Sequence, residues 1–421
     1  MTLAQARLRF LVLIGMRWFP VGLTIPVLVL LPLERGLSIA QIGSLAAIQG
    51  FTVLFLELPT GGLTDALGRR PVLLLAGAVN VVSLALIASA SSALLFGAAY
   101  FLQGVYRALD SGPLEAWFVD RALAADPAAD LETALSRSGV VVGLSISGAA
   151  LISGGLIWLG PLGPVSALTL PVLVALVLSV AATVAVALLM TEERPARGAA
   201  ALVASIRGVP TAIGGALGLV RRSRVVLALI GVELLWSVGM VTFEKLMPLR
   251  LSEVTADPDA AAALMGPVSS VAWAASAAGA AVVPLLTRRI GAPWTGFTLR
   301  LVQGATILGM GLAGGPAGLI AAFLLTYAVH GAANPVHAAL LHRQAEGEYR
   351  ASLLSLNSML GQPGFAIGSI VLTAVAARAG TPAAIMTGAI VLAAAAPLYL
   401  VRERTAFREP SHSGTSESQA L

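Results

Sequence analysis

Long apolar runs separated by short polar stretches organise this chain. From Phe10 onward, segments of mostly apolar residues alternate with brief clusters of Arg, Asp, Glu and Gly. A helix of about 20 apolar residues spans the hydrocarbon core of a bilayer. The pattern predicts twelve transmembrane helices, at 10–33, 37–62, 71–92, 94–120, 134–158, 165–190, 224–249, 262–287, 294–314, 316–342, 352–377 and 382–401.

A hydrophilic interval divides these helices into two sets of six. It predicts an N-terminal bundle at 1–190, a cytoplasmic linker at 191–223 with a piece lying at the membrane interface, a C-terminal bundle at 224–401 and a disordered cytoplasmic tail at 402–421. Short stretches recur between the two sets. LTDALG at 63–68 returns as LTRRIG at 286–291, and Leu-Pro-Leu at 31–33 returns as Met-Pro-Leu at 247–249. We therefore expect an all-α membrane protein of two pseudo-symmetric six-helix bundles.

Composition agrees with a multi-pass membrane protein. Hydrophobic residues make up 57% of the chain, charged residues make up 11%, and the mean hydropathy is +0.89. There is no cysteine, which excludes disulfides, thiolate metal sites and thiol catalysis. In a soluble chain the net charge of +5 would suggest nucleic acid. Here every basic residue except Lys245 is Arg, and most lie at the ends of apolar segments, so we expect no nucleic-acid partner.

The distribution of Arg predicts the orientation. Arg69, Arg70 and most other arginines fall on one side of the predicted helices, whereas Arg35, Arg250 and Arg378 fall on the other. The positive-inside rule places the Arg-rich side in the cytoplasm, together with both termini. The bias toward Ala, Gly, Val, Leu and Arg resembles a GC-rich bacterial genome. We expect a monomer in a bacterial plasma membrane.

The stretch from Glu57 to Pro71 concentrates charge and glycine between two apolar runs. Gly61, Asp65, Gly68, Arg69 and Arg70 resemble the GxxxD(R/K)xGR(R/K) signature of the major facilitator superfamily, with Ala66 in place of the frequent basic residue. In that family the signature is the cytoplasmic loop between helices 2 and 3.

The resemblance implies a secondary transporter working by alternating access on a small molecule. It also implies a cytoplasmic gate of Asp65, Arg69 and Asp120, whose network holds the two bundles' inner ends together and breaks on opening.

Two further signatures are incomplete. Gln103 and Gly104 match the end of the helix 4 RxxQG motif of proton-coupled members, but Tyr100 replaces its Arg. The antiporter motif GPxxGG corresponds to residues 150–155, which lack its proline. Transport is therefore expected, whereas antiport is open.

Ionisable residues inside the predicted helices are candidate functional groups, because each costs at least about 2.5 kcal/mol at bilayer depth and needs a partner or a cavity. Arg17 corresponds to Glu233 in the repeat, so the two could pair across the central cavity; alternatively, Asp110 neutralises Arg17 within its own bundle. The candidates are Arg17, Glu57, Arg107, Asp110, Glu115, Glu233, Glu244, Lys245 and Arg300.

Helix 4 holds three of these groups. Arg107 and Asp110 lie one turn apart on one face, which favours an intrahelical pair. Glu115 then has no local cation and is a candidate proton carrier, or else a hydrated acid near the cytoplasmic mouth. The proton-coupling candidates are Glu115, Asp110, Glu57 and Glu233. The adjacent Glu244 and Lys245 are interpreted as a solvated outer mouth.

Cavity-lining candidates combine charge with aromatic surface. They are Arg17, Trp18, Tyr106, Arg107, Trp236 and Asn334. His330, His337 and His342 do not share one helix face, so we expect no metal site, and no cofactor motif is present.

These observations favour a transporter and not an enzyme. We expect proton-coupled efflux of small apolar or amphiphilic compounds. The alternative is an importer or facilitator of a polar nutrient or organic anion, with Arg17 and Arg300 as anion ligands.

Overall fold

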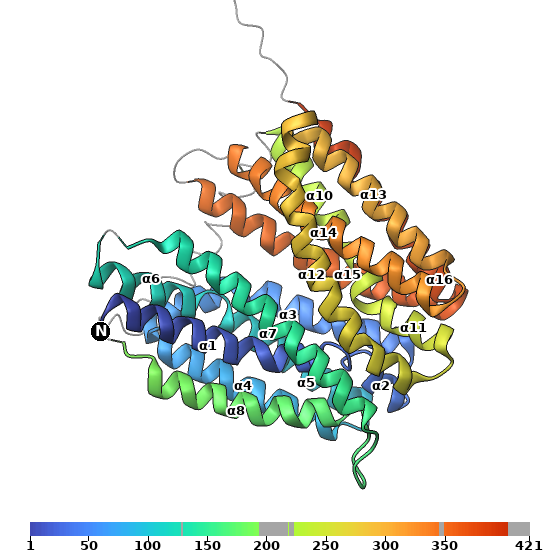
Figure 1. Ribbon diagram of the computed structural model, residues 1–421, viewed down its shortest axis with the longest axis horizontal. Coiled ribbons are helices and arrows are strands. Elements are labelled where there is room, and N and C mark those ends of the chain that lie inside the picture. The colour runs from blue at the N-terminus through green and yellow to red at the C-terminus, as the bar shows by residue number, and fades with distance from the viewer. Residues whose placement is uncertain (128, 193–217, 219–222, 345–348, 403–421) are drawn as a thin grey trace, which may run out of the picture.

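The computed structural model describes residues 1–127, 129–192, 218, 223–344 and 349–402. Most of the predicted linker and all of the predicted tail beyond Arg402 lie outside these residues. The described chain is helical (Figure 1), and its helices are α1 (Leu3–Thr24), α2 (Leu30–Glu34), α3 (Ile39–Leu67), α4 (Arg69–Ser89), α5 (Ala93–Asp110), α6 (Pro113–Ala125), α7 (Leu131–Trp158), α8 (Leu170–Leu189), α10 (Arg224–Val241), η1 (Thr242–Leu246), α11 (Met247–Thr255), α12 (Pro258–Ile290), α13 (Ala292–Leu312), α14 (Pro316–Gln344), α15 (Tyr349–Ala379), α16 (Thr381–Ala393) and η2 (Ala396–Leu400).

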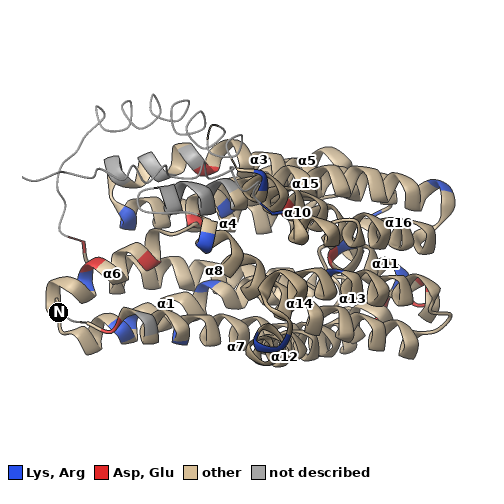
Figure 2. Cartoon of the chain, turned by 90° about the horizontal axis from the view of Figure 1, so that it is seen from above, with Lys and Arg blue, Asp and Glu red and all other residues tan. Residues whose placement is uncertain are grey.

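The prediction of an all-α membrane protein is confirmed. Within the described residues, nine helical segments are long and apolar enough to cross a membrane. The first, fourth and ninth predicted spans are helical as well, in α1–α2, α5–α6 and α13. The first two are interrupted, whereas α13 is continuous but less apolar. In Figure 2 the positions of Lys, Arg, Asp and Glu are sparse along most of the helix bodies.

Three predicted spans are interrupted, and proline accounts for each interruption. A proline lacks the N–H that bonds the carbonyl four residues earlier, and its ring collides with that carbonyl. Pro32 follows the turn between α1 and α2, Pro113 begins α6 after Gly112 at φ +90°, and Pro248 follows the π-helical turn η1. The prediction of one continuous helix at 94–120 is therefore wrong.

The helices fall into two groups, α1–α8 and α10–η2, called here the first half and the second half. In Figure 1 they are the blue-to-green and the yellow-to-red helices. The halves meet where α3 packs along α15 and α7 along α12. Glycines permit this approach. A Cβ at Gly43 would lie 2.5 Å from the Ser369 carbonyl oxygen, and one at Gly154 would lie 2.6 Å from the Ala263 carbonyl oxygen.

The molecule has two distinguishable ends. The Gly68 end is where α3 passes into α4, and the Arg250 end carries α2 and α11. Two arginines close corresponding helices at the Arg250 end. The Arg35 guanidinium donates to the Ala90 carbonyl at 2.6 Å, and that of Arg250 donates to the Ala313 carbonyl at 2.9 Å. Cations at helix C-termini also favour the helix dipole.

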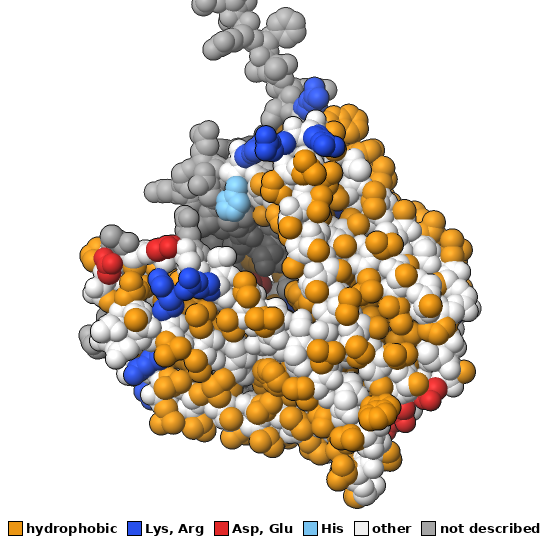
Figure 3. All heavy atoms as spheres, viewed as in Figure 1, with side chains coloured by type: hydrophobic (Ala, Val, Ile, Leu, Met, Phe, Trp, Pro, Cys, Tyr) orange, Lys and Arg blue, Asp and Glu red, His pale blue; other side chains and the backbone are white. Residues whose placement is uncertain are grey.

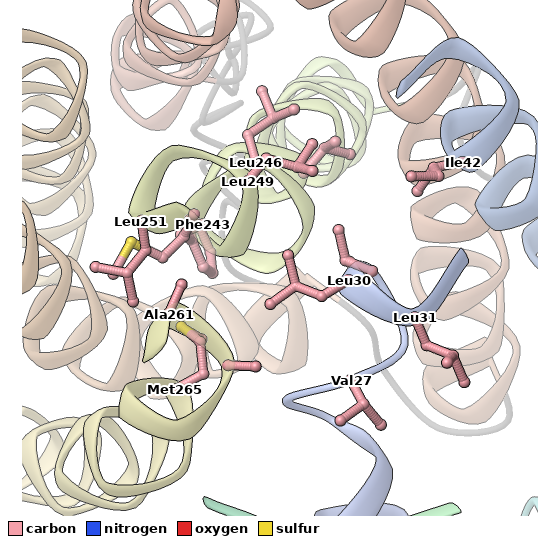
Figure 4. Packing of buried hydrophobic residues seen from close by; sticks show 14 of the residues in the cluster. Val27, Leu30, Leu31, Ile42, Phe243, Leu246, Leu249, Leu251, Ala261 and Met265 are labelled. Atoms are coloured by element: carbon pink, nitrogen blue, oxygen red, sulfur yellow. The ribbon is translucent and has the colours of Figure 1, made fainter. Parts of the chain in front are cut away.

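The halves are closed at the Arg250 end and separated at the Gly68 end. A buried apolar cluster joins them at the closed end (Figure 4), and it includes Val27, Leu30 and Leu31 of the first half and Phe243 and Leu246 of the second. At the other end the space-filling surface is hollowed between the halves (Figure 3). The structure is therefore one state of a molecule with a cleft open at the Gly68 end.

One acidic cap lies outside the membrane-spanning segments. Asp130 precedes α7, and its carboxylate accepts from the Thr133 backbone N–H at 2.9 Å. Hydrogen bonds from the Thr133 side chain and backbone lower the pKa of the Asp130 carboxyl from its usual value.

Candidate functional site

Each half has a polar cluster of its own among its helices. In the first half, Arg17 of α1 forms an ion pair with Asp110 of α5. Tyr106 lies beside Arg17, and both line a small internal cavity together with Asn80 and Ser179. The prediction of an intrahelical Arg107–Asp110 pair is wrong, because α1 brings a second cation to Asp110. Arg17 is not paired with Glu233. Of the two predicted alternatives, the structure shows the one in which Asp110 neutralises Arg17 within the first half.

Arg107 consequently has no ion-pair partner among the described residues. Its side chain is exposed on α5, and Glu57 in α3 is the acid whose charge interacts with it. One Glu57 carboxylate oxygen is buried without a hydrogen bond. A hydrogen bond of 3.0 Å from the Thr60 hydroxyl to the Ala108 carbonyl fixes α3 against α5 at this level.

The second half carries a hydrogen-bonded network around Glu233. Its carboxylate lies 3.6 Å from His337 Nε2, which is also 3.3 Å from Asn357 Oδ1. His337 Nδ1 lies 3.1 Å from the Tyr399 hydroxyl. Four helical elements, α10, α14, α15 and η2, thus contribute to one cluster. Glu233 and the two protonatable neighbours form a chain along which a proton could pass.

Arg300 supplies the positive charge of this network. The side chain is 1% exposed, and it donates to Gln303 Oε1 at 2.7 Å. Its guanidinium lies 5.4 Å from the Trp236 ring centroid, and its charge acts on Glu233 without an ion pair at 4.0 Å or less among the described residues. Arg300 is therefore part of the wall of the second half and is not free to bind a solute, contrary to its proposed role as an anion ligand.

An aromatic ledge adjoins the network. Trp236 and His330 stack with ring centroids 5.5 Å apart, and Asn334, which is exposed, lies 3.2 Å from His330 Nε2. Trp236 and Asn334 thus both lie beside His330, and their role in a cavity stays a prediction. Trp18 instead packs against an apolar cluster inside the first half.

The residues Glu244 and Lys245 lie in the π-helical turn η1, which is buried at the junction of the halves. Glu244 accepts a hydrogen bond of 2.7 Å from the Tyr327 hydroxyl, and Lys245 Nζ lies 5.8 Å from the Phe365 ring centroid. The interpretation of this pair as a solvated outer mouth is wrong. In the sequence, Pro248 indicates that the helix is interrupted at Glu244, because a proline leaves the carbonyl four residues earlier without its helical hydrogen bond.

The predicted gate residues lie together at the Gly68 end of the first half. Arg69 forms an ion pair with Asp120 and donates to the Ala116 carbonyl at 2.7 Å. The side chain of Asp65 lies outside the described residues. The Arg69–Asp120 pair is formed although the cleft is open at this end, so the hypothesis that the network breaks on opening does not describe these two residues.

A missed contact strengthens this corner. The Glu192 carboxylate accepts the backbone N–H groups of Arg69 and Arg70 at 2.9 and 3.0 Å and thereby caps α4. Glu115, by contrast, is exposed in the first turn of α6. That position matches the hydrated acid, because α6 is separate from the helix that carries Asp110.

No group of three or more metal-ligating side chains occurs in the part of the chain that the structure describes. The three histidines of α14 diverge: His330 is in the ledge, His337 is in the network, and His342 is exposed.

Comparisons with known proteins address the fold and the family. The family model "Major Facilitator Superfamily" matches residues 10–329. Among solved structures, the nucleoside transporter NupG superposes with a TM-score of 0.77 at 14% identity, covering 94% of this chain and 100% of that one. A POT family transporter in complex with a thioalcohol-conjugated peptide gives a TM-score of 0.71 at 13% identity, covering 94% and 95%. A comparison with curated protein sequences finds no match.

The structural likenesses, at such low identity, concern the fold alone. The family model covers well over half of the chain, and two helix groups around an open cleft agree with it. The chain belongs to the major facilitator superfamily of secondary transporters.

Proposed function

We propose that this transporter couples proton movement to the efflux of small amphiphilic compounds, with Glu233 as its proton site. The observation that carries the proposal is the Glu233–His337 contact, flanked by Asn357 and balanced by the charge of Arg300. A carboxylate in such a wall changes the charge of its surroundings when it takes up or releases a proton.

The coupling follows from how the charges balance. With Glu233 ionised, Arg300 has a counter-charge close by. With Glu233 protonated, the positive charge of Arg300 is uncompensated in a low-dielectric wall. The two protonation states therefore differ in how favourably the cleft can close, because a closed cleft removes the water that screens the charge. Protonation biases the choice between the two open states.

The direction of transport is also part of the proposal. Arg-rich segments at the Gly68 end favour a cytoplasmic location for that end, so the observed state has its cleft open toward the cytoplasm. An exporter loads its substrate in this state. Opening to the other side would require the two halves to move as bundles 1–190 and 224–401 about the α3–α15 and α7–α12 contacts.

Proton flux in proteoliposomes tests the proton site. Purified protein is reconstituted with an internal pH dye, and ethidium, 2-naphthoate or 2-naphthamide is added under an imposed pH gradient. We expect at least one compound to change proton flux in the unmodified protein and the change to fall at least tenfold in Glu233→Gln. Glu115→Gln is the matched control, because it removes an exposed carboxylate. Full coupling in Glu233→Gln, or equal loss in both variants, would refute the proton site.

Import of an organic anion with protons is the second candidate. The observation that favours it is that Arg107 of the first half and Lys245 of the second have no ion-pair partner among the described residues. Reversing the pH gradient distinguishes the two directions. An exporter that exchanges substrate for protons accumulates the compound on the acidic side, whereas a symporter accumulates it on the alkaline side.

A further inference from the structure

A groove with a volume of about 520 Å³ lies on the outside of the molecule, where α3 runs beside α5 and α15 (Figure 2). Seven residues of α3, spaced three or four positions apart from Ser44 to Leu56, line it together with Phe101 of α5 and Ile370 of α15. This spacing puts the seven residues on one face of α3, over a length of about 18 Å. The groove is therefore long and follows a single helix.

The groove and the charged residues of the same helices lie on different faces. Successive residues of an α-helix point about 100° apart, so the Glu57 side chain points about 160° away from that of Phe55. Phe55 is 71% exposed, and Phe101 is exposed as well. Leu94, seven residues before Phe101 on the same face of α5, is also exposed. The groove is thus continuous with the apolar surface that the spanning helices present to the bilayer.

The lining of the groove offers no free hydrogen-bond donor. Its two polar side chains, Ser44 and Thr52, donate to carbonyls of their own helix: the Ser44 hydroxyl to Ala40 at 3.1 Å and the Thr52 hydroxyl to Ile48 at 2.7 Å. A polar molecule placed there would lose its hydrogen bonds to water or headgroups without replacement, which is unfavourable. A hydrocarbon chain loses none, and a narrow groove about 18 Å long suits its shape.

The groove crosses the junction of the two halves. Its α3 and α5 residues belong to the first half, whereas Ile370 belongs to the second. The two helices are in close contact beside it, because a Cβ at Gly50 of α3 would lie 3.3 Å from Ala366 Cβ and one at Gly43 would lie 2.5 Å from the Ser369 carbonyl oxygen. A chain lying in the groove therefore contacts both halves at once.

We propose that this groove binds one acyl chain of a membrane lipid, which lies along α3 and connects the two halves. This inference concerns the lipid-facing side of the junction and depends neither on proton coupling nor on the identity of the transported compound. A ligand that contacts both halves favours the state in which its contacts are assembled. The chain therefore stabilises the state that is closed at the Arg250 end.

Photo-crosslinking in a bilayer tests the site. Purified protein is placed in nanodiscs of dioleoyl phosphatidylcholine that contain a small fraction of a phosphatidylcholine with a diazirine in the middle of one acyl chain. After irradiation, mass spectrometry locates the adducts. Leu144 of α7 is the internal reference, because it is 69% exposed, nearly as much as Phe55, and lies outside the groove. We expect at least five times more adduct at Phe55 than at Leu144.

Substitutions then locate the chain. Ser44→Trp fills the groove from an exposed position, and Phe101→Ala removes one of its walls; each should lower the ratio of adduct at Phe55 to adduct at Leu144 at least fivefold. Leu94→Ala is the matched control, because it removes an exposed apolar side chain of α5 outside the groove, and should leave the ratio unchanged. Equal adduct at Phe55 and Leu144, or an unchanged ratio in both groove variants, would show bulk lipid only and overturn the proposal.

Two further results bear on the occupant and its effect. A disulfide between two copies of the Phe55→Cys variant would show that a second copy of the chain covers the groove, and would overturn the proposal. Val27→Cys reports on the closed end, where Val27 is fully buried. Phe101→Ala should speed its reaction with a polar maleimide at least threefold in nanodiscs, and Leu94→Ala should not. An equal rate in the two variants would overturn the connection between the halves.

Discussion

The contact between α7 and α12 predicts a substitution that opens the closed end of the molecule. Gly154 and Gly266 face each other there, and a Cβ at Gly154 would lie 2.6 Å from the Ala263 carbonyl oxygen and 3.2 Å from Gly266 Cα. Ordinary van der Waals contact begins near 3.4 Å, so the Cβ alone requires a separation of 3.4 − 2.6 = 0.8 Å. Both neighbours are backbone atoms, which cannot rotate away. Gly154→Val adds two further methyl groups to this position.

Gly154→Val destabilises only the state in which the halves are closed at the Arg250 end. Overpacking of a tight contact costs roughly 1–3 kcal/mol, and here it is paid only while the halves are closed at the Arg250 end. In a state where they separate at that end, Gly154 is relieved of the contact. A bias of about 1–3 kcal/mol corresponds to a population change of roughly 5- to 150-fold. We therefore expect Gly154→Val to shift the protein toward a state open at the Arg250 end.

Thiol labelling measures the shift, because the chain has no cysteine of its own. Val27→Cys places a reporter in the closed apolar cluster, where Val27 is 0% exposed. We expect its reaction with a polar maleimide to be faster by the above factor when Gly154→Val is added. Gly155→Val is the control, since Gly155 is exposed and no atom lies within 4 Å of its Cβ position. Equal labelling in the two valine variants would refute the reasoning.

Three further changes test local contacts. Asp110→Asn should lower the free energy of unfolding by about 3–5 kcal/mol, because it leaves Arg17 charged and unpaired. Adding Arg17→Met should restore part of this loss. Melting in detergent measures both variants, and additive losses would contradict the pairing. Tyr100→Phe removes the hydroxyl that donates a hydrogen bond to the Leu28 carbonyl, next to the break between α1 and α2. The change should lower the free energy of unfolding by about 1–3 kcal/mol. An unchanged melting temperature would show that this hydrogen bond does not stabilise the protein. The pKa of the Asp130 carboxyl is lowered in the folded protein, so its contribution to stability is present above the unfolded-state pKa and is lost as pH falls through the folded-state pKa. Asp130→Asn should therefore remove this part of the fall in melting temperature at low pH. An unchanged fall in the variant would contradict the prediction.

The spans of this protein were predictable from sequence, whereas their interruptions were not recognised. Apolar length alone sets where a helix crosses a bilayer, and each predicted span corresponds to helix in the structure. The breaks depend on single residues. Pro32 and Pro248 are parts of the repeated tripeptide, which relates the two sets of helices but does not by itself indicate a break. The same two prolines explain why helix breaks occur at related positions, before residues 31–33 and 247–249.

The partners of the buried charges were less predictable, for a physical reason. A charge inside the membrane requires compensation, but sequence spacing states only which groups share a helix face. Asp110 has Arg107 one turn away, and yet it pairs with Arg17, which reaches it from α1. Packing of separate helices decides such a choice. The alternative of a local Arg17–Asp110 pair follows from sequence because a buried charge needs some partner, which leaves the choice of partner open.

Because Asp110 pairs with Arg17 and not with Arg107, a different cation of the first half is left without an ion-pair partner. If Arg107 had paired with Asp110, the first half would present Arg17 as its unpaired cation, buried behind α5. Because Arg17 pairs with Asp110, the cation that remains on α5 is Arg107, which is exposed. The second half behaves similarly, since the Arg300 charge is balanced within the wall by Glu233 and the remaining cation is Lys245 at the junction. Asp110 is thus engaged by Arg17 and Glu233 by His337, and Arg107 of the first half and Lys245 of the second have no ion-pair partner among the described residues.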